Sequence, residues 1–323
     1  MKNTEKIELL REKINKTLSS IIGPNENVVL TDLPYHSNIG DLLIWEGERQ
    51  YLKEINCHCL NKSSSATFTF PDYSSEITLL LHGGGNFGDI WRVSQEFRLK
   101  VISRYKQNKI ILFPQSVYYM NQNLVIEDSQ IFSTHKHLFL CARDLRSYHF
   151  LRSYFPKNEV MLVPDMAFYI SESVLTKYRN VTQEKSPLYI RRKDKETCNK
   201  ITKIPGCQQV DWPSLEHHCL ETLIMSGMLR FVSLRFSCDW QKRVADLYAD
   251  RYLRQFLVEL GCKLLGRYPE IITDRLHAMI LGVLLHKNVY YIDNNSGKLS
   301  AFVETWFEDL DSVARYLPTE SQA

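Results

Sequence analysis

Hydrophobic positions along the chain follow two alternating patterns, one typical of buried strands and one typical of helices. Short runs rich in β-branched residues and leucine are typical of strands that are buried on both faces. Longer stretches between them repeat apolar residues every three or four positions, as helices packed on a core do. This alternation predicts parallel βαβ units. The predicted strands cover residues 28–30, 77–81, 110–113, 138–141, 160–163, 188–190, 208–211, 231–234, 271–273 and 289–292.

Helical periodicity begins near the N-terminus, where Leu10, Ile14, Leu18 and Ile21 form one apolar stripe before Gly23-Pro24 ends the pattern. Several cations surround the stripe, so this helix either docks on its own domain or lies on an anionic lipid surface. The cations are Lys2, Lys6, Arg11, Lys13 and Lys16. The predicted helices cover residues 3–22, 41–55, 89–105, 145–155, 214–228, 238–266, 279–285 and 299–307.

A polar segment over residues 171–186 interrupts the alternation before Pro187, which fits a domain linker. We therefore predict two domains of ordinary size, 1–175 and 176–323. Both have the βαβ pattern, so the expected architecture is α/β, with two Rossmann-like domains facing each other across a cleft in a GT-B-like arrangement.

Composition excludes several classes of protein. The chain has 323 residues, 44% of them hydrophobic and 24% charged, with a net charge of +3, so no nucleic-acid partner is indicated. The longest apolar run, 279–285, is too short to span a membrane, and no signal peptide is visible, so a cytoplasmic location is expected. Cys57-His58-Cys59 lacks a second ligand pair, and the eight cysteines indicate neither a metal nor disulfides.

The stretch Asp274-Arg275-Leu276-His277 falls between a predicted strand and a predicted helix. Ligands of open α/β sheets bind at this carboxyl edge, and Thr273 or Asp274 suits the helix N-cap. Arg275 and His277 would serve an anion and a proton-transfer step. Because residues two apart do not share a helix face, one of them must lie on the turn. Alternatively, Arg275 caps a carboxylate and His277 packs against the next strand.

Two loops of the first half share the pattern Asn-apolar-Gly-Asp, at residues 38–41 and 86–89. The aspartates can cap the helices that follow, or the loops can present amides and carboxylates to sugar hydroxyls in a cleft. Both interpretations stay open. The candidate acceptor-binding residues here are Asn38, Asp41, Asn86 and Asp89.

The loop that directly follows the predicted strand 77–81 reads His82-Gly83-Gly84-Gly85. Three glycines let backbone N–H groups approach a ligand, although a plain tight turn also fits. The pattern is neither a dinucleotide fingerprint nor a Walker loop. At the next strand end, Gln115 and Ser116 extend the same polar rim. We count His82, Gly84, Gly85, Gln115 and Ser116 as candidate acceptor-binding residues.

In the second half, Arg191-Arg192-Lys193 directly follows a predicted strand, as Arg275 does. Such a charge run is usually solvated, yet two arginines from neighbouring strand ends can clamp a phosphate or carboxylate. Either Arg191 or Arg192 can fill this role. Lys298, after the last predicted strand, supplies a further positive charge.

Six segments in register resemble the polysaccharide pyruvyltransferase family over about residues 28–307. This resemblance implies a GT-B-like fold and an enzyme that moves the pyruvyl unit of phosphoenolpyruvate onto two hydroxyls of one sugar, forming a ketal and releasing phosphate. The acceptors would be surface polysaccharides or their lipid-linked precursors. The segments are HGGGNFGD (82–89), FPQS (113–116), VPDMAF (163–168), RKD (192–194), TDRLH (273–277) and DNNSGK (293–298).

The resemblance implies that Arg192 and Arg275 hold the phosphate and carboxylate of the donor, that Leu276 lines its pocket and that His277 is the acid/base. One departure is Ala278-Met279, where many members have Gly-His. The scheme needs neither a metal nor a redox cofactor. Two alternatives remain on the same scaffold: a glycosyltransferase that uses a nucleotide sugar, and a non-catalytic carbohydrate-binding protein.

Overall fold

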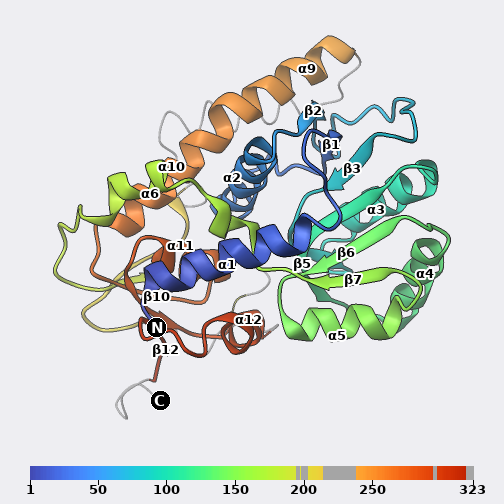
Figure 1. The fold of residues 1–323 in the computed structure, drawn as a ribbon. Helices are drawn as coiled ribbons and strands as arrows, with labels where there is room; N and C mark the ends of the chain where they lie inside the picture. The colour runs from blue at the N-terminus through green and yellow to red at the C-terminus, as the bar shows by residue number, and fades with distance from the viewer. Residues whose placement is uncertain (194–196, 198–202, 214–237, 294–296, 318–323) are drawn as a thin grey trace.

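The computed structural model describes residues 1–193, 197, 203–213, 238–293 and 297–317, and it contains two sheets surrounded by helices (Figure 1). The first sheet has the order β2-β1-β3-β5-β6-β7, and β4 also pairs with β5. All of these pairings are parallel. Its strands are β1 Asn27–Thr31, β2 His58–Lys62, β3 Thr78–Leu81, β4 Gly84–Gly88, β5 Ile110–Tyr118, β6 Leu138–Ala142 and β7 Glu159–Leu162.

The second sheet has the order β12-β11-β10-β8-β9 and is also parallel throughout. The predicted α/β class with parallel sheets is therefore confirmed. The predicted helix at 214–228 and strand at 231–234 lie outside the described residues. The strands of this sheet are β8 Leu188–Ile190, β9 Gln208–Val210, β10 Glu270–Thr273, β11 Asn288–Tyr291 and β12 Val313–Arg315.

Helices connect most of the strands, and the described part of the chain also contains a 3₁₀ turn at Met166–Tyr169 and a π turn at Ala249–Leu253 that joins α9 to α10. The polar segment 171–186, expected to be a linker, contains α6, which packs on α10. The helices are α1 Asn3–Leu18, α2 Ile39–Glu54, α3 Arg92–Arg104, α4 Gln122–Ser133, α5 Leu145–Tyr154, α6 Glu172–Arg179, α9 Asp239–Tyr248, α10 Arg254–Gly266, α11 Leu276–Leu284 and α12 Lys298–Trp306.

One hydrophobic core is shared by residues of both sheets. Helix α2 packs against α10 and α11, and α1 packs against α11. The apolar stripe of α1, including Leu10, Ile14 and Leu18, is fully buried in this core. The N-terminal helix is thus docked on the protein, which is the first of the two alternatives considered for it.

Two local features differ from the sequence prediction near the sheet edge. Strand β5 continues past Phe113 to Tyr118, and the glycine-rich loop after β3 forms β4, which pairs with the extension. Glycine and proline disfavour strands, so pairing between the two segments outweighs local propensity here. The N-cap of α11 is Arg275, not Thr273 or Asp274 as expected, while the Thr273 hydroxyl accepts a hydrogen bond from the Arg275 N–H.

Candidate active site

A cavity of about 500 Å³ lies where strand ends of both sheets meet. Its wall combines residues that follow β1, β6, β8 and β10 with residues from β4 and from the beginnings of α3, α11 and α12. This is the carboxyl edge at which α/β sheets bind ligands. The lining residues are His36, Ser37, Asn38, Asp41, Gly85, Asn86, Trp91, Ser94, Arg143, Arg192, Trp212, Arg275, Leu276, His277 and Lys298.

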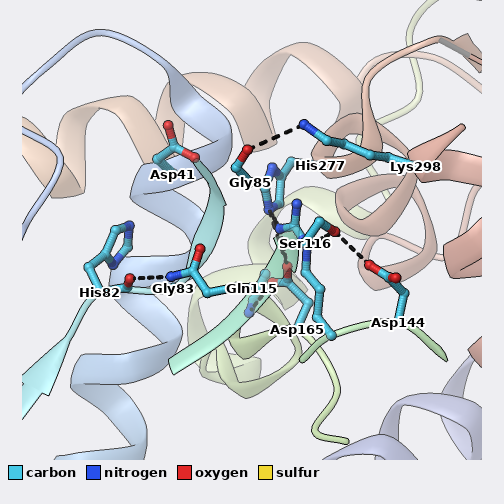
Figure 2. Close-up of polar contacts among 12 residues, drawn as sticks. Asp41, His82, Gly83, Gly85, Gln115, Ser116, Asp144, Asp165, His277 and Lys298 are labelled. Carbon is cyan, nitrogen blue, oxygen red and sulfur yellow. Dashed lines mark hydrogen bonds and ion pairs between the residues drawn. The ribbon is translucent and has the colours of Figure 1, made fainter. Parts of the chain in front are cut away.

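The imidazole of His277 shares a buried carboxylate with an arginine (Figure 2). Its Nε2 lies 3.3 Å from Asp165 Oδ2, and Arg143 Nη1 donates to the same oxygen at 2.8 Å. Burial raises the pKa of Asp165, but His277, Arg143 and the Ala167 N–H outweigh it and hold that pKa well below its usual value. Asp165 is therefore ionised and fixes the imidazole in one orientation.

The backbone of α2 fixes the other side of the imidazole. A Cβ at Gly40 would lie only 2.5 Å from His277 Nδ1, so no larger residue fits there without movement. Gly40 belongs to the Asn38–Asp41 loop, and the Asn38 side chain caps α2 by accepting from the Gly40 N–H at 3.2 Å. In this loop the glycine provides close approach rather than an unusual backbone angle.

Arg275 occupies the turn before α11, as the spacing of the two residues requires, since its backbone is extended while His277 is helical. Its Nη2 and Nε both donate to the Asp211 carboxylate, at 2.7 Å for Nη2. Arg275 thus has the carboxylate partner of the alternative interpretation, and it also lines the cavity. Asp211 accepts further bonds from the Lys193 and Trp212 N–H groups, which fixes the guanidinium.

Arg192, and not Arg191, lines the cavity. Its backbone N–H donates to Asp274 Oδ1 at 2.7 Å, whereas the Arg191 N–H donates to Val210 in the sheet. Asp274 is 1% exposed, and burial raises its pKa to about 6. The strand end of β8 is therefore tied to the strand end of β10, which brings the side chains of Arg192 and Arg275 to one wall.

Positive charge predominates among the described lining residues. Arg143, Arg192, Arg275 and Lys298 contribute four cations, against the single carboxylate of Asp41. Lys298 Nζ donates to the Gly85 carbonyl at 3.3 Å, as Figure 2 shows. A Cβ at Gly85 would lie 3.0 Å from Arg143 Nη2 and 3.3 Å from Lys298 Nζ. The glycine thus lets two cations converge, which suits a ligand with more than one negative group.

Amide and carboxylate groups line another part of the cavity. Asn38 Nδ2 donates to Asp41 Oδ2 at 2.8 Å, and His36 Nε2 lies 3.5 Å from the same oxygen. Burial raises the pKa of Asp41, but His36, His277, His82 and Arg143 reverse this and lower it overall. Asn86 also lines the cavity, and its Oδ1 accepts from the fully buried Arg98. This wall offers hydrogen-bond acceptors to hydroxyl groups.

The remaining candidate residues lie outside the lining. His82 Nδ1 pairs with the buried Glu48 at 2.8 Å, and the Gln115 amide donates to the His82 carbonyl at 2.6 Å. Asp89 accepts from the Met120 and Asn121 N–H groups instead of capping α3. Gly84, with φ +133°, lies in β4, and Arg191 lies at the end of β8.

Ser116 supports the site from behind the wall. Its hydroxyl donates to Asp144 at 2.6 Å and accepts from Arg143 Nε at 2.9 Å (Figure 2). Sequence reasoning missed Arg143 and Asp165. Both directly follow predicted strands, in Ala142-Arg143-Asp144 and Val163-Pro164-Asp165. Their position at the carboxyl edge of the sheet could therefore have indicated them. Within the described residues, no group of three potential metal-ligating side chains comes together.

Comparison with known proteins identifies the family of the chain. The family model described as polysaccharide pyruvyl transferase matches residues 38–296, and the chain belongs to that family. The chain is 28% identical to "Putative pyruvyl transferase EpsO" of Bacillus subtilis over 314 residues, covering 94% of this chain and 92% of that protein. It is 29% identical to "Pyruvyl transferase 1" of Schizosaccharomyces pombe over 307 residues, covering 90% of this chain and 72% of that protein.

A solved structure supports the fold. A functionally uncharacterized protein from Klebsiella pneumoniae superposes with a TM-score of 0.65, covering 96% of this chain and 99% of its own at 20% identity. Membership of this family makes the chain a polysaccharide pyruvyl transferase by class. No helix in the described ranges has the length and apolar character that a membrane crossing requires.

Proposed function

We propose that this protein transfers the pyruvyl group of phosphoenolpyruvate to two hydroxyls of one sugar, forming a ketal on a surface polysaccharide or its lipid-linked precursor. One observation carries the proposal: Arg192, after β8, and Arg275 and His277, both after β10, line one cavity. Its cationic wall is combined with a wall of amide and carboxylate groups, as a site for an anionic donor and a hydroxylated acceptor requires.

The donor is assigned to the cationic wall. Phosphoenolpyruvate carries a phosphate and a carboxylate, and the arginines at positions 192 and 275 together with Lys298 bind these groups, with Leu276 beside them. Hydrogen bonds to charged groups contribute ~1.5–3 kcal/mol each. Asp211 holds Arg275 in a fixed orientation, so little side-chain entropy is lost when the donor binds.

His277 is the general acid and base of the proposed reaction. Transfer of a proton to the methylene carbon of the enol gives C2 oxocarbenium character, and a sugar hydroxyl attacks C2 with loss of its own proton. The second hydroxyl then displaces phosphate and closes the ketal. Asp165, 3.3 Å from Nε2, keeps the imidazole oriented for both transfers.

The acceptor is assigned to the wall that contains Asn38, Asp41, Asn86 and the backbone of Gly85. His82, Gly84, Asp89, Gln115 and Ser116 act on it only indirectly, through the loops they fix. We extend the proposal to a GT-B-like arrangement of two domains, 1–175 and 176–323, in a cytoplasmic enzyme that uses no metal or redox cofactor.

Phosphate release tests the proposal. The protein is incubated with saccharide acceptors and either phosphoenolpyruvate or a nucleotide sugar, and phosphate and the mass increment of a pyruvyl ketal are measured. We expect activity with phosphoenolpyruvate alone, and His277→Ala lowering kcat by ~10²–10⁴-fold while donor binding persists. The control His58→Ala changes an exposed histidine on the edge strand β2 and should leave kcat unchanged. Transfer only from the nucleotide sugar, or a fully active His277→Ala enzyme, contradicts the proposal.

A further inference from the structure

Helix α9 exposes an apolar stripe that has no role in the site described above. Trp240, Val244 and Leu247 recur at the helical spacing of four and three residues and therefore share one face. Their exposed fractions are 62%, 51% and 51%, although residues of these types usually lie inside. Tyr252 in the following turn is 63% exposed and stacks on Tyr248. Figure 1 shows α9 at the outer end of the long helical segment that continues into α10.

The opposite face of α9 is attached to the first sheet. Asp246 accepts from the Tyr35 hydroxyl at 2.8 Å and from Thr67 at 2.6 Å. In the turn after α9, Asp250 accepts from Lys62 of β2 at 2.7 Å. These bonds fix the rotation of the helix about its axis, so the apolar stripe points outward for a structural reason.

Two of the three carboxylates of the segment 239–253 are bonded on its attached face. The carboxylates of Asp246 and Asp250 are turned inward and bonded to the body of the protein. The exposed charged residues beside the outward stripe are Asp239, Arg243 and Arg251, so this side of the segment carries a net positive charge. A helix with exposed tryptophan, valine and leucine flanked by arginine lies in the interface of an anionic bilayer, where long basic side chains reach the headgroups.

We propose that α9 is a membrane-docking helix, which lies on an anionic lipid surface with Trp240, Val244 and Leu247 in the interface and Arg243 and Arg251 on the headgroups. The opposite charge of the two arginines and the lipid favours this occupant over a protein surface. The proposal goes beyond the transfer reaction and does not depend on the identity of the donor.

The docking helix is connected to the lining of the cavity through Tyr35. Tyr35, which bonds to Asp246, is followed in the chain by His36 and Ser37, and both of these line the cavity. The ring of Tyr35 also stacks on Trp45 of α2, 5.8 Å between centroids. A bilayer under α9 therefore holds the acceptor wall of the cavity next to the membrane surface, within reach of a saccharide attached to lipid.

Vesicle binding tests the inference. The full chain is mixed with vesicles of phosphatidylcholine alone or of phosphatidylcholine with phosphatidylglycerol, and binding is measured by flotation at several salt concentrations. We expect binding only to the anionic vesicles, weakening as salt rises. Tryptophan emission should shift to the blue on binding, and Trp240→Phe should remove most of this shift. Of the other tryptophans, Trp45 and Trp212 are buried, Trp306 is half-buried, and Trp91, 41% exposed, lies in the cavity lining and not on α9.

Matched variants separate the docking helix from the rest of the surface. Val244→Ser with Leu247→Ser should lower vesicle affinity by roughly tenfold or more, and so should Arg243→Glu with Arg251→Glu. The controls are Ile126→Ser, 52% exposed on α4, and the exposed pair Lys106→Glu with Lys136→Glu. All variants should keep the melting temperature and the phosphate release of the unchanged protein with a soluble acceptor.

Three outcomes overturn the inference. The first is no binding to anionic vesicles. The second is an equal loss of binding in the control and the α9 variants, which would make the contact a general effect of charge. The third is a dimer, found by light scattering, that Val244→Ser with Leu247→Ser dissociates, because the stripe would then be covered by a second copy. None of these outcomes changes the expected phosphate release, so the two proposals fail separately.

Discussion

Asp165 has the most demanding role of any single residue at this site, because one of its oxygens serves both Arg143 and His277. A buried carboxylate between two such groups is stable only while it is charged and they remain in place. Asp165→Asn keeps the size of the side chain but removes this charge. We expect kcat to fall by about 10²-fold, as the imidazole loses its orientation. Asp144→Asn is the matched control: it changes a buried carboxylate that touches Ser116 but not His277.

The same substitution has a pH-dependent effect on stability. Loss of one partner of a buried pair costs about 3 kcal/mol in the free energy of unfolding. The pKa of Asp165 is held below its usual value, so its contribution is fully present above about pH 4 and is lost as the pH falls through the lowered pKa. Denaturant unfolding of both proteins should show a constant difference at neutral pH that narrows below pH 4. A difference that widens in acid would contradict this account of the pair.

At the scale of elements, the position of His277 depends on how closely two helix beginnings approach. Gly40→Ala would place a methyl group 2.5 Å from the imidazole Nδ1, so α2 or His277 must shift. We expect kcat to fall by at least about tenfold, since proton transfer depends on sub-ångström placement. Gly266→Ala is the control, because its Cβ would meet the Tyr178 carbonyl at 2.6 Å, on α10 and away from the cavity. Comparable loss of kcat in both variants would assign the effect to stability alone.

The elements also show what the sequence could predict. Several elements lie close to the ranges predicted from hydrophobic periodicity, because burial imposes that periodicity on the residues. They are strands β3, β6, β8, β10 and β11 and helices α2, α5, α11 and α12. Strand β4 and the second half of β5 could not be predicted, since β4 is mostly glycine and the second half of β5 begins at Pro114, so that their mutual pairing makes them strands. Short edge strands such as β2 and β12 carry little apolar signal either.

The candidate site shows the same limit. The turn at 274–277 and the loops at 38–41 and 85–86 could be predicted as lining, because chemistry and strand position coincide there. The buried partners could not, because contact between Asp211 and Arg275, or between Asp165 and His277, joins residues 64 and 112 positions apart. No local pattern records such a pairing. His82 was misleading for the same reason: its partner, Glu48, lies inside α2.

At the scale of the whole molecule, the two sheets are connected by more than a shared cavity. Helix α10, from the second half of the chain, packs on α2, and α1, from the first half, packs on α11. Residues of both sheets belong to one continuous core. A boundary at residues 175 and 176 stays a prediction, and this packing implies that the two halves, whatever their boundary, unfold together.

Leu281→Ala tests this coupling, because Leu281 of α11 is fully buried in the shared core and faces Gly261 of α10. Removing its side chain should cost about 2–5 kcal/mol. If the core is one cooperative unit, hydrogen exchange in denaturant should show equal loss of protection in β3 and β10. This is expected although Leu281 is close in sequence to β10 and far from β3. Leu151→Ala is the reciprocal test: this fully buried residue of α5 lies in a separate core of the first half of the chain, and the variant should also lower protection equally in β3 and β10. Protection lost in β10 alone would instead separate the halves, and hinge motion across the cavity would then become the expected route for substrate entry.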